Sequence, residues 1–182
     1  MNLLLAFAPF IAFAVVDRLV GSVEGLVAGA AVSVALLLRD ALTPGRSPKI
    51  LEIGSAVLFT GLAAYALFAA PDWSVMAVRL RVDVGLLAIV LVSLAIGKPF
   101  TLQYAKESVD PQHWNSPVFL RTNRVITAVW ALAFMVLVAA DLLILYAPQV
   151  PHQVGIVATI LALVAAFKFT SDYPRRVRER SP

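Results

Sequence analysis

Residues 125–146 read VITAVWALAFMVLVAADLLILY, and this run carries one charged side chain, Asp141, in 22 positions. A helix rises about 1.5 Å per residue, so about 20 mainly apolar residues cross a hydrocarbon core about 30 Å thick. In lipid every backbone polar group must be paired within the segment, which a helix achieves by itself. The run therefore predicts a membrane-spanning helix.

Apolar runs of this kind recur along the 182 residues, of which 60% are hydrophobic and 14% charged. Soluble domains average about 45–50% apolar and about 25% charged residues. Solid runs rather than alternating apolar and polar positions favour helices over a β-barrel. We predict an all-α integral membrane protein, a single bundle over residues 1–182 with six transmembrane helices. Their expected ranges are 3–20, 23–38, 50–70, 75–96, 117–146 and 154–171.

The Lys and Arg residues are concentrated in every second gap between these segments. Cations collect in the gap before residue 50, in the loop 97–124 and in the tail 172–182, whereas 71–77 and 147–153 contain neither Lys nor Arg. Cytoplasmic loops are enriched in Lys and Arg. The pattern predicts that both termini are cytoplasmic, which requires an even number of spans.

Two segments fit this topology less simply. Residues 3–20 have a short apolar run before Asp17 and Arg18, so the first segment is expected to be a short span or a re-entrant hairpin, and five spans remain possible. Ala12-Phe13-Ala14 resembles a signal-peptidase site, but no basic region precedes it, and we expect the segment to be retained. Arg79 and Arg81 lie at the outer end of the fourth segment, where Asp83 can pair with Arg79 and long side chains can reach the headgroups.

Small residues recur at four-residue spacing on the second segment: Gly21, Gly25, Gly29 and Ser33. Such a face allows another helix backbone to approach closely in lipid. Internal packing of the bundle is the expected role, and a homodimer contact is the alternative.

Helix boundaries are also indicated. Ser47-Pro48 and Ser116-Pro117 each resemble an N-cap followed by proline at the first helical position. Pro174 is expected just beyond the end of the last helix.

The loop 97–124 is the longest gap and the candidate functional surface. Phe100 and Tyr104 are four residues apart, which suits a short helix lying on anionic headgroups. A plain cytoplasmic anchor is the alternative. The candidate lipid- or partner-binding residues are Lys98, Phe100, Tyr104, Lys106, Trp114, Arg121 and Arg124, together with Arg79 and Arg81.

Several classes of site are not expected. The chain has no cysteine, so disulfides, thiolate metal sites and a cysteine nucleophile are excluded. His113 and His152 fall in gaps on opposite sides and cannot share a metal or haem. There is no phosphate-binding glycine loop. No enzymatic activity, cofactor or nucleic-acid partner is expected. Asp141 is a candidate intramembrane relay, because a charge within a membrane helix is costly.

The order of several motifs resembles the intracellular septation protein A family, small polytopic proteins of the bacterial inner membrane. They are Phe7-Ala8-Pro9-Phe10, Lys49, Arg79 and Arg81, Lys98-Pro99, Lys106-Glu107, Phe119 with Asn123, and Trp130. The sequence departs from that pattern in a longer Asn123 to Trp130 interval and in having Asp141 where a neutral amide is expected.

The resemblance implies a role in cell-envelope maintenance and cell division, through division or cell-wall synthesis proteins and through membrane lipid. It implies no catalysis. A small lipid or solute transporter that uses the bundle interior is one alternative function. An accessory subunit of a larger membrane complex is another.

Overall fold

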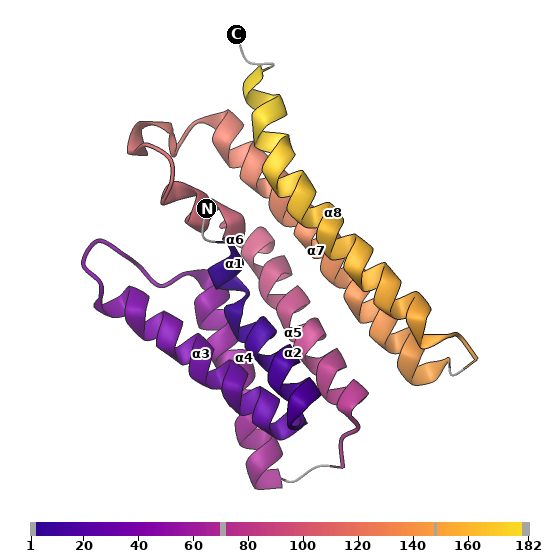
Figure 1. The fold of residues 1–182 in the computed structure, drawn as a ribbon. Helices are drawn as coiled ribbons and strands as arrows, with labels where there is room; N and C mark the ends of the chain where they lie inside the picture. The colour runs from indigo at the N-terminus through magenta and orange to yellow at the C-terminus, as the bar shows by residue number, and fades with distance from the viewer. Residues whose placement is uncertain (1–2, 70–71, 148, 180–182) are drawn as a thin grey trace. The chain divides into compact units, whose positions relative to one another are not determined.

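The computed structural model describes residues 3–69, 72–147 and 149–179, and within them the chain is helical and contains no strand (Figure 1). Two compact units divide the chain between Ile89 and Val90. The boundary falls within helix α5 (Val75–Ala95), so that α5 contributes to both units. Each unit is described by itself.

The first unit opens with α1 (Leu3–Ala6) and α2 (Ala8–Leu19), which turns sharply into α3 (Ser22–Leu42). The Ser22 hydroxyl donates a hydrogen bond of 2.6 Å to Asp17 Oδ1 across this turn. A Cβ atom on Gly25 would lie 3.0 Å from the backbone nitrogen of Asp17. Gly25 therefore allows the backbones of α2 and α3 to approach closely, as a small-residue face does in lipid.

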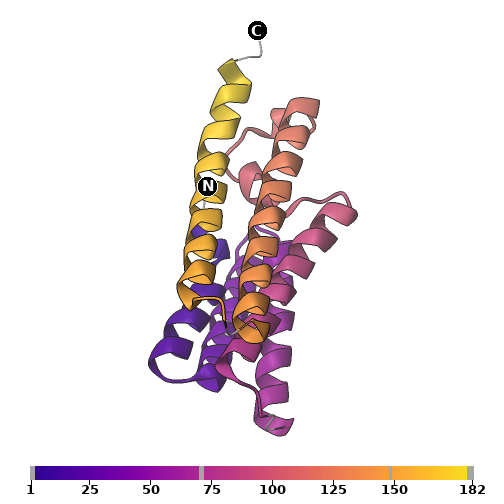
Figure 2. The same ribbon diagram turned by 90° about the vertical axis from the view of Figure 1, so that its right-hand side faces the viewer.

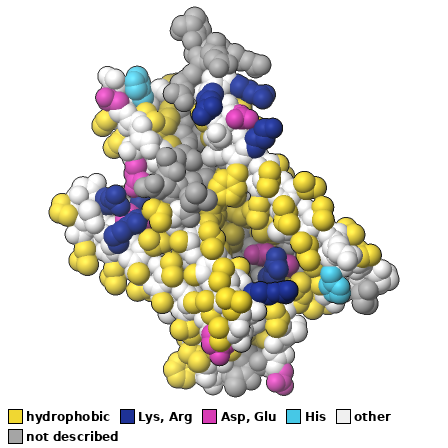
Figure 3. Space-filling model, in the orientation of Figure 1, with side chains coloured by type: hydrophobic (Ala, Val, Ile, Leu, Met, Phe, Trp, Pro, Cys, Tyr) yellow, Lys and Arg dark blue, Asp and Glu magenta, His cyan; other side chains and the backbone are white. Residues whose placement is uncertain are grey.

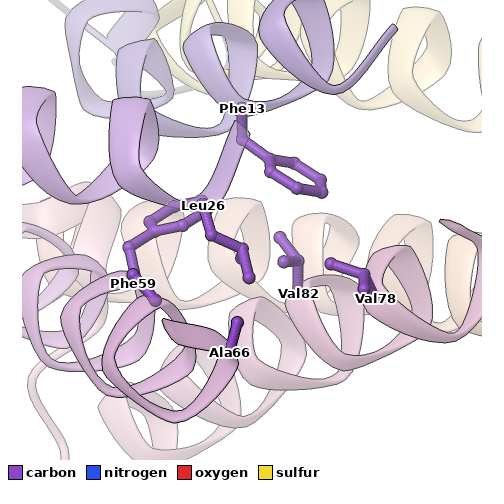
Figure 4. Packing of buried hydrophobic residues seen from close by; sticks show 7 residues of the cluster. Phe13, Leu26, Phe59, Ala66, Val78 and Val82 are labelled. Atoms are coloured by element: carbon purple, nitrogen blue, oxygen red, sulfur yellow. The ribbon is translucent and has the colours of Figure 1, made fainter. Parts of the chain in front are cut away.

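The core of this unit is built around Phe59 from α4 (Ile50–Ala69), which is fully buried. The Phe59 ring lies 5.0 Å from that of Phe10 and 5.8 Å from that of Phe13, centroid to centroid. A Cβ atom on Gly29 would lie 2.5 Å from Cδ1 of Phe59. Figure 4 shows this cluster, which also contains Leu26, Ala63, Ala66, Val78 and Val82. Gly25 and Gly29 thus face helices of the same chain.

Where helices α4 and α5 pack together, a glycine of each helix faces a large branched side chain of the other. A Cβ atom on Gly54 of α4 would meet Ile89 of α5, and one on Gly85 of α5 would meet Leu58 of α4. Each branched side chain therefore occupies the space that the facing glycine leaves.

The second unit contains α6 (Phe100–Lys106), the short 3-10 helix η1 (Pro111–His113), α7 (Pro117–Tyr146) and α8 (His152–Glu179). Helices α7 and α8 form a long antiparallel hairpin that lies side by side in both views (Figures 1 and 2). Trp130 Nε1 donates a 3.0 Å hydrogen bond to Thr170 Oγ1 across it. Nearer the turn, a Cβ atom on Gly155 would meet Ile144.

Among the residues that the structure describes, four helices are long and apolar enough to cross a membrane: α3, α4, α7 and α8, the last over His152–Val177. Helices α5 and α6 reach that standard together, as a pair bent by 74°, which gives a fifth candidate. These apolar helices are compatible with a multi-pass membrane protein. Six spans are not confirmed, because the first segment is divided into α1 of 4 residues and α2 of 12 residues, and α2 by itself reaches only about 18 Å.

The predicted helix boundaries hold in one place and fail in two. Ser116 caps α7, with its hydroxyl accepting a 3.1 Å hydrogen bond from the Phe119 amide, so that prediction is confirmed. Ser47 does not start a helix, because α4 begins at Ile50. Pro174 does not end α8, which continues to Glu179. Proline removes a single backbone hydrogen bond, and the helix continues on either side of it.

Candidate functional site

The basic loop 97–124 is anchored to α7 by buried polar contacts. Gly97 ends α5 in the left-handed conformation at φ 71°, which glycine adopts without steric cost. Thr101 Oγ1 then donates a 3.0 Å hydrogen bond to the Asn123 carbonyl and lies 2.7 Å from Thr127 Oγ1. All three of these α6 and α7 residues are buried. The contacts fix α6 against the first turns of α7.

Phe100 and Tyr104 do not lie on a surface. Phe100 is fully buried and Tyr104 is 2% exposed. The expectation that these two rings rest on headgroups is therefore wrong. Helix α6 turns its aromatic face toward protein, because removing these rings from solvent is more favourable than exposing them next to charged side chains.

The cations of the loop remain accessible. Lys98, Arg121 and Arg124 are exposed, and Lys106 is half-buried. The Lys106 ammonium lies 5.1 Å from the centre of the Trp114 ring, within cation–π range. Trp114 Nε1 in turn donates a 2.9 Å hydrogen bond to the Val109 carbonyl. The loop thus presents positive charge while its aromatic residues stay in the protein.

The hairpin brings the basic tail to the same end as the start of α7. Trp130 pairs with Thr170, and the two helices run on past this pair in opposite senses, so Arg124 reaches about the level of Arg176. Arg175 and Arg176 are exposed. The sequence alone suggested the loop and the tail as separate features. We call the combined set the basic end, which consists of Lys98, Lys106, Arg121, Arg124, Arg175 and Arg176.

Arg81, at the start of α5, lies on an aromatic stack. Its guanidinium carbon is 4.1 Å from the centre of the Trp73 ring, which stacks on Tyr65 at 5.1 Å. Arg81 Nη1 also donates a 2.6 Å hydrogen bond to the Ala77 carbonyl. Arg79 is half-buried. The stack accommodates Arg81 at the end of an apolar helix through a cation–π contact.

Asp141, the predicted intramembrane acid, is 2% exposed near the end of α7.

Ser33 is fully buried, with its hydroxyl donating a 2.9 Å hydrogen bond to the Ala30 carbonyl. Gly21 precedes α3 as its N-cap. The four residues of the small-residue face therefore do not share one role: two allow close packing, one caps the helix and one bonds within it.

The structure also contains a group of charged side chains that was not predicted from the sequence. We call it the α3–α4 ion cluster, and it consists of Arg39, Asp40, Arg46, Lys49 and Glu52. The Lys49 ammonium pairs with Asp40 Oδ2 and lies 3.3 Å from Glu52 Oε1. The side chains of these three residues are 5% exposed or less. On the other Asp40 oxygen, Oδ1, Arg39 Nη2 lies at 2.7 Å and Arg46 Nη1 at 3.3 Å.

The α3–α4 ion cluster also explains why α4 begins where it does. Glu52 Oε2 accepts a 3.2 Å hydrogen bond from the Lys49 backbone amide, which is the reciprocal half of a capping box. The Lys49 to Glu52 spacing could have indicated this bond from sequence. Asp40, nine positions before Lys49 and across a turn, could not be assigned to it in the same way.

The described part of the chain shows no metal-binding arrangement: no group of three or more His, Asp or Glu side chains there could hold a metal ion. His113 and His152 are both exposed, in η1 and at the start of α8.

Hydrophobic side chains cover much of the face drawn in Figure 3, and Lys and Arg gather there in a few groups. Helix α8 in particular exposes Ile156, Ile160, Leu161 and Val164. Apolar surface of this extent is expected of a helix that faces lipid.

No family model, curated protein or solved structure matches this chain.

Proposed function

We propose that this chain is a non-enzymatic multi-pass protein of the bacterial inner membrane that takes part in cell-envelope maintenance and division. Its termini lie in the cytoplasm, and the basic end is its contact surface for anionic lipid headgroups. The resemblance in motif order to the septation protein A family supports the envelope role, and the charge pattern supports the orientation.

One observation carries the proposal: the α7–α8 hairpin has its cations at one end. Residues 125–167 contain neither Lys nor Arg, whereas Arg121, Arg124, Arg175 and Arg176 are exposed beyond the Trp130–Thr170 pair. Lys and Arg near the ends of short loops set orientation toward the cytoplasm. The cytoplasmic leaflet carries the anionic surface potential that such cations meet.

The basic end is also organised beyond what an anchor needs. The bonds from Thr101 to α7 hold α6 in place, and Trp114 lies beside Lys106. Each cation near an anionic leaflet contributes about 1 kcal/mol of attraction. The attraction between exposed charges falls at high salt, because the screening length shrinks to about 3 Å at 1 M.

The double variant Arg121→Gln/Arg124→Gln is expected to weaken phosphatidylglycerol binding. Two lost cations amount to about 2 kcal/mol, or about 30-fold in affinity at low salt. The control, Arg18→Gln/Lys168→Gln, removes the same charge from two other exposed positions. Native mass spectrometry of the detergent-solubilised protein, titrated with phosphatidylglycerol, measures the affinity. Equal loss in both double variants would contradict the proposed surface.

A further inference from the structure

The α3–α4 ion cluster contains more positive than negative charge. Arg39, Arg46 and Lys49 face Asp40 and Glu52, which leaves an excess of one positive charge when all five are ionised. The Lys49 ammonium is paired with the two buried carboxylates, Asp40 and Glu52. The excess therefore resides on the two arginines, whose side chains are 38% and 41% exposed.

We propose that Arg39 and Arg46 form a binding site for a phosphate group, presented by a lipid headgroup or by a free phosphate anion. A guanidinium has five N–H donors in a planar fork. Asp40 engages Nε and Nη2 of Arg39 and Nη1 of Arg46. Each guanidinium has more donors than this one oxygen accepts, and phosphate oxygens match the fork geometry.

The two arginines are held in place before any ligand arrives. Asp40 is fully buried and paired with Lys49, so the oxygen that both guanidiniums share has a fixed position. Arg46 follows a tight turn in which its amide donates a 3.1 Å hydrogen bond to the Thr43 carbonyl and Gly45 has φ 80°. Thr43 Oγ1 donates a 2.6 Å hydrogen bond to the Arg39 carbonyl. Such preorganisation lowers the entropic cost of binding.

The location agrees with a phosphate ligand. Arg39 lies in the last turn of α3, and Arg46 lies between α3 and α4. Both helices are long and apolar enough to cross a membrane, so the cluster lies where the apolar stretches end. Lipid phosphates occupy that boundary of a bilayer. The site belongs to the first unit and does not depend on the basic end.

The most direct test keeps the positive charge at positions 39 and 46 and removes the planar guanidinium groups. Arg39→Lys/Arg46→Lys retains both positive charges but loses the planar forks, and affinity is expected to fall about tenfold. The control Arg18→Lys makes the same exchange at an exposed position of α2. Binding of dioctanoyl phosphatidylglycerol and, separately, of inorganic phosphate is measured by calorimetry in detergent at constant ionic strength.

Three outcomes support the site and identify its ligand. In each of them the Lys variant loses the binding that the wild type shows. If the wild type binds both probes tightly, phosphate alone suffices. If it binds only the lipid, the lipid headgroup is required, and if it binds only inorganic phosphate, the ligand is soluble. Equal affinity of wild type and Lys variant for both probes would overturn the proposal, as would no binding by wild type.

A second variant separates a built site from diffuse attraction. Asp40→Asn raises the net charge by one, so diffuse attraction requires tighter binding of the anion. The built site requires weaker binding, because a neutral amide oxygen holds the two guanidiniums less firmly than the carboxylate does, and the amide NH2 group cannot accept a hydrogen bond from Lys49. The circular dichroism spectrum and melting temperature establish that the variant is folded. Tighter binding by folded Asp40→Asn would contradict the proposal.

Discussion

Lys49→Met is expected to lower the free energy of unfolding by about 3–5 kcal/mol, the usual range for removing one partner of a buried ion pair. Lys49 is the cation that contacts both Asp40 and Glu52, and all three side chains are 5% exposed or less. Without it, Glu52 is left without its cation, while Asp40 keeps only the two half-exposed arginines. The cluster would then be neutral overall, but its positive charge would lie on the half-exposed arginines at Asp40 and not beside the buried Glu52 carboxylate.

The measurement is reversible unfolding in mixed micelles by titration with sodium dodecyl sulfate, followed by circular dichroism. Lys168→Met is the matched control, because Lys168 is exposed on α8. The triple variant Asp40→Asn/Lys49→Met/Glu52→Gln also removes the negative charges of the two carboxylates. It is expected to recover much of the lost free energy of unfolding, since the effects of mutations within one network are not additive. Equal stability of Lys49→Met and Lys168→Met would show that the cluster contributes nothing to folding.

Trp130→Ala is expected to cost about 3–5 kcal/mol, as large aromatic truncations in a packed interior do. Trp130 is 1% exposed, and its ring lies 5.5 Å from that of Phe134 and 4.9 Å from that of Phe167. Its indole N–H bonds Thr170 on the facing helix. The truncation removes packing on both sides of the α7–α8 hairpin and the hydrogen bond that fixes its register.

Two variants separate these contributions in the same unfolding titration. Trp130→Phe keeps most of the ring but removes the N–H donor, so a loss of about 1 kcal/mol is expected. Leu132→Ala truncates an exposed apolar residue of the same helix and is expected to change stability little. If Trp130→Ala were no less stable than Leu132→Ala, the hairpin would not depend on this contact.

Much of the helical framework could be predicted from the sequence, because long apolar runs leave few alternatives to a helix. The fifth segment was expected over 117–146, and α7 spans Pro117–Tyr146. The failures occur where tertiary contacts decide. The first segment ends at Leu19, close to the expected residue 20, but it is divided into α1 and α2. Helix α4 is capped through Lys49 and Glu52 rather than Ser47.

The accessibility of some candidate site residues could be predicted from the sequence. Lys98, Arg121 and Arg124 lie near the ends of apolar runs and are exposed, while their contact with lipid or a partner stays a prediction. The facing direction of α6 was not predictable, since Phe100 and Tyr104 suit a lipid face and a protein face equally. The arginines on Asp40 were missed because the second segment was expected to end at residue 38, whereas α3 continues to Leu42 and includes Asp40. The cation Lys49 that pairs with Asp40 is nine positions later, across a turn.

The orientation of the helices can be measured directly, because the chain has no cysteine and single cysteines can be introduced without background. Ser47, Ser74, Ser108 and Gln149 are exposed positions in four successive gaps between the long helices. In spheroplasts, a membrane-impermeant maleimide is expected to label Ser74→Cys and Gln149→Cys directly, and Ser47→Cys and Ser108→Cys only after permeabilisation. Labelling of Ser108→Cys in sealed spheroplasts, or equal labelling of all four, would contradict a multi-pass protein whose basic end faces the cytoplasm.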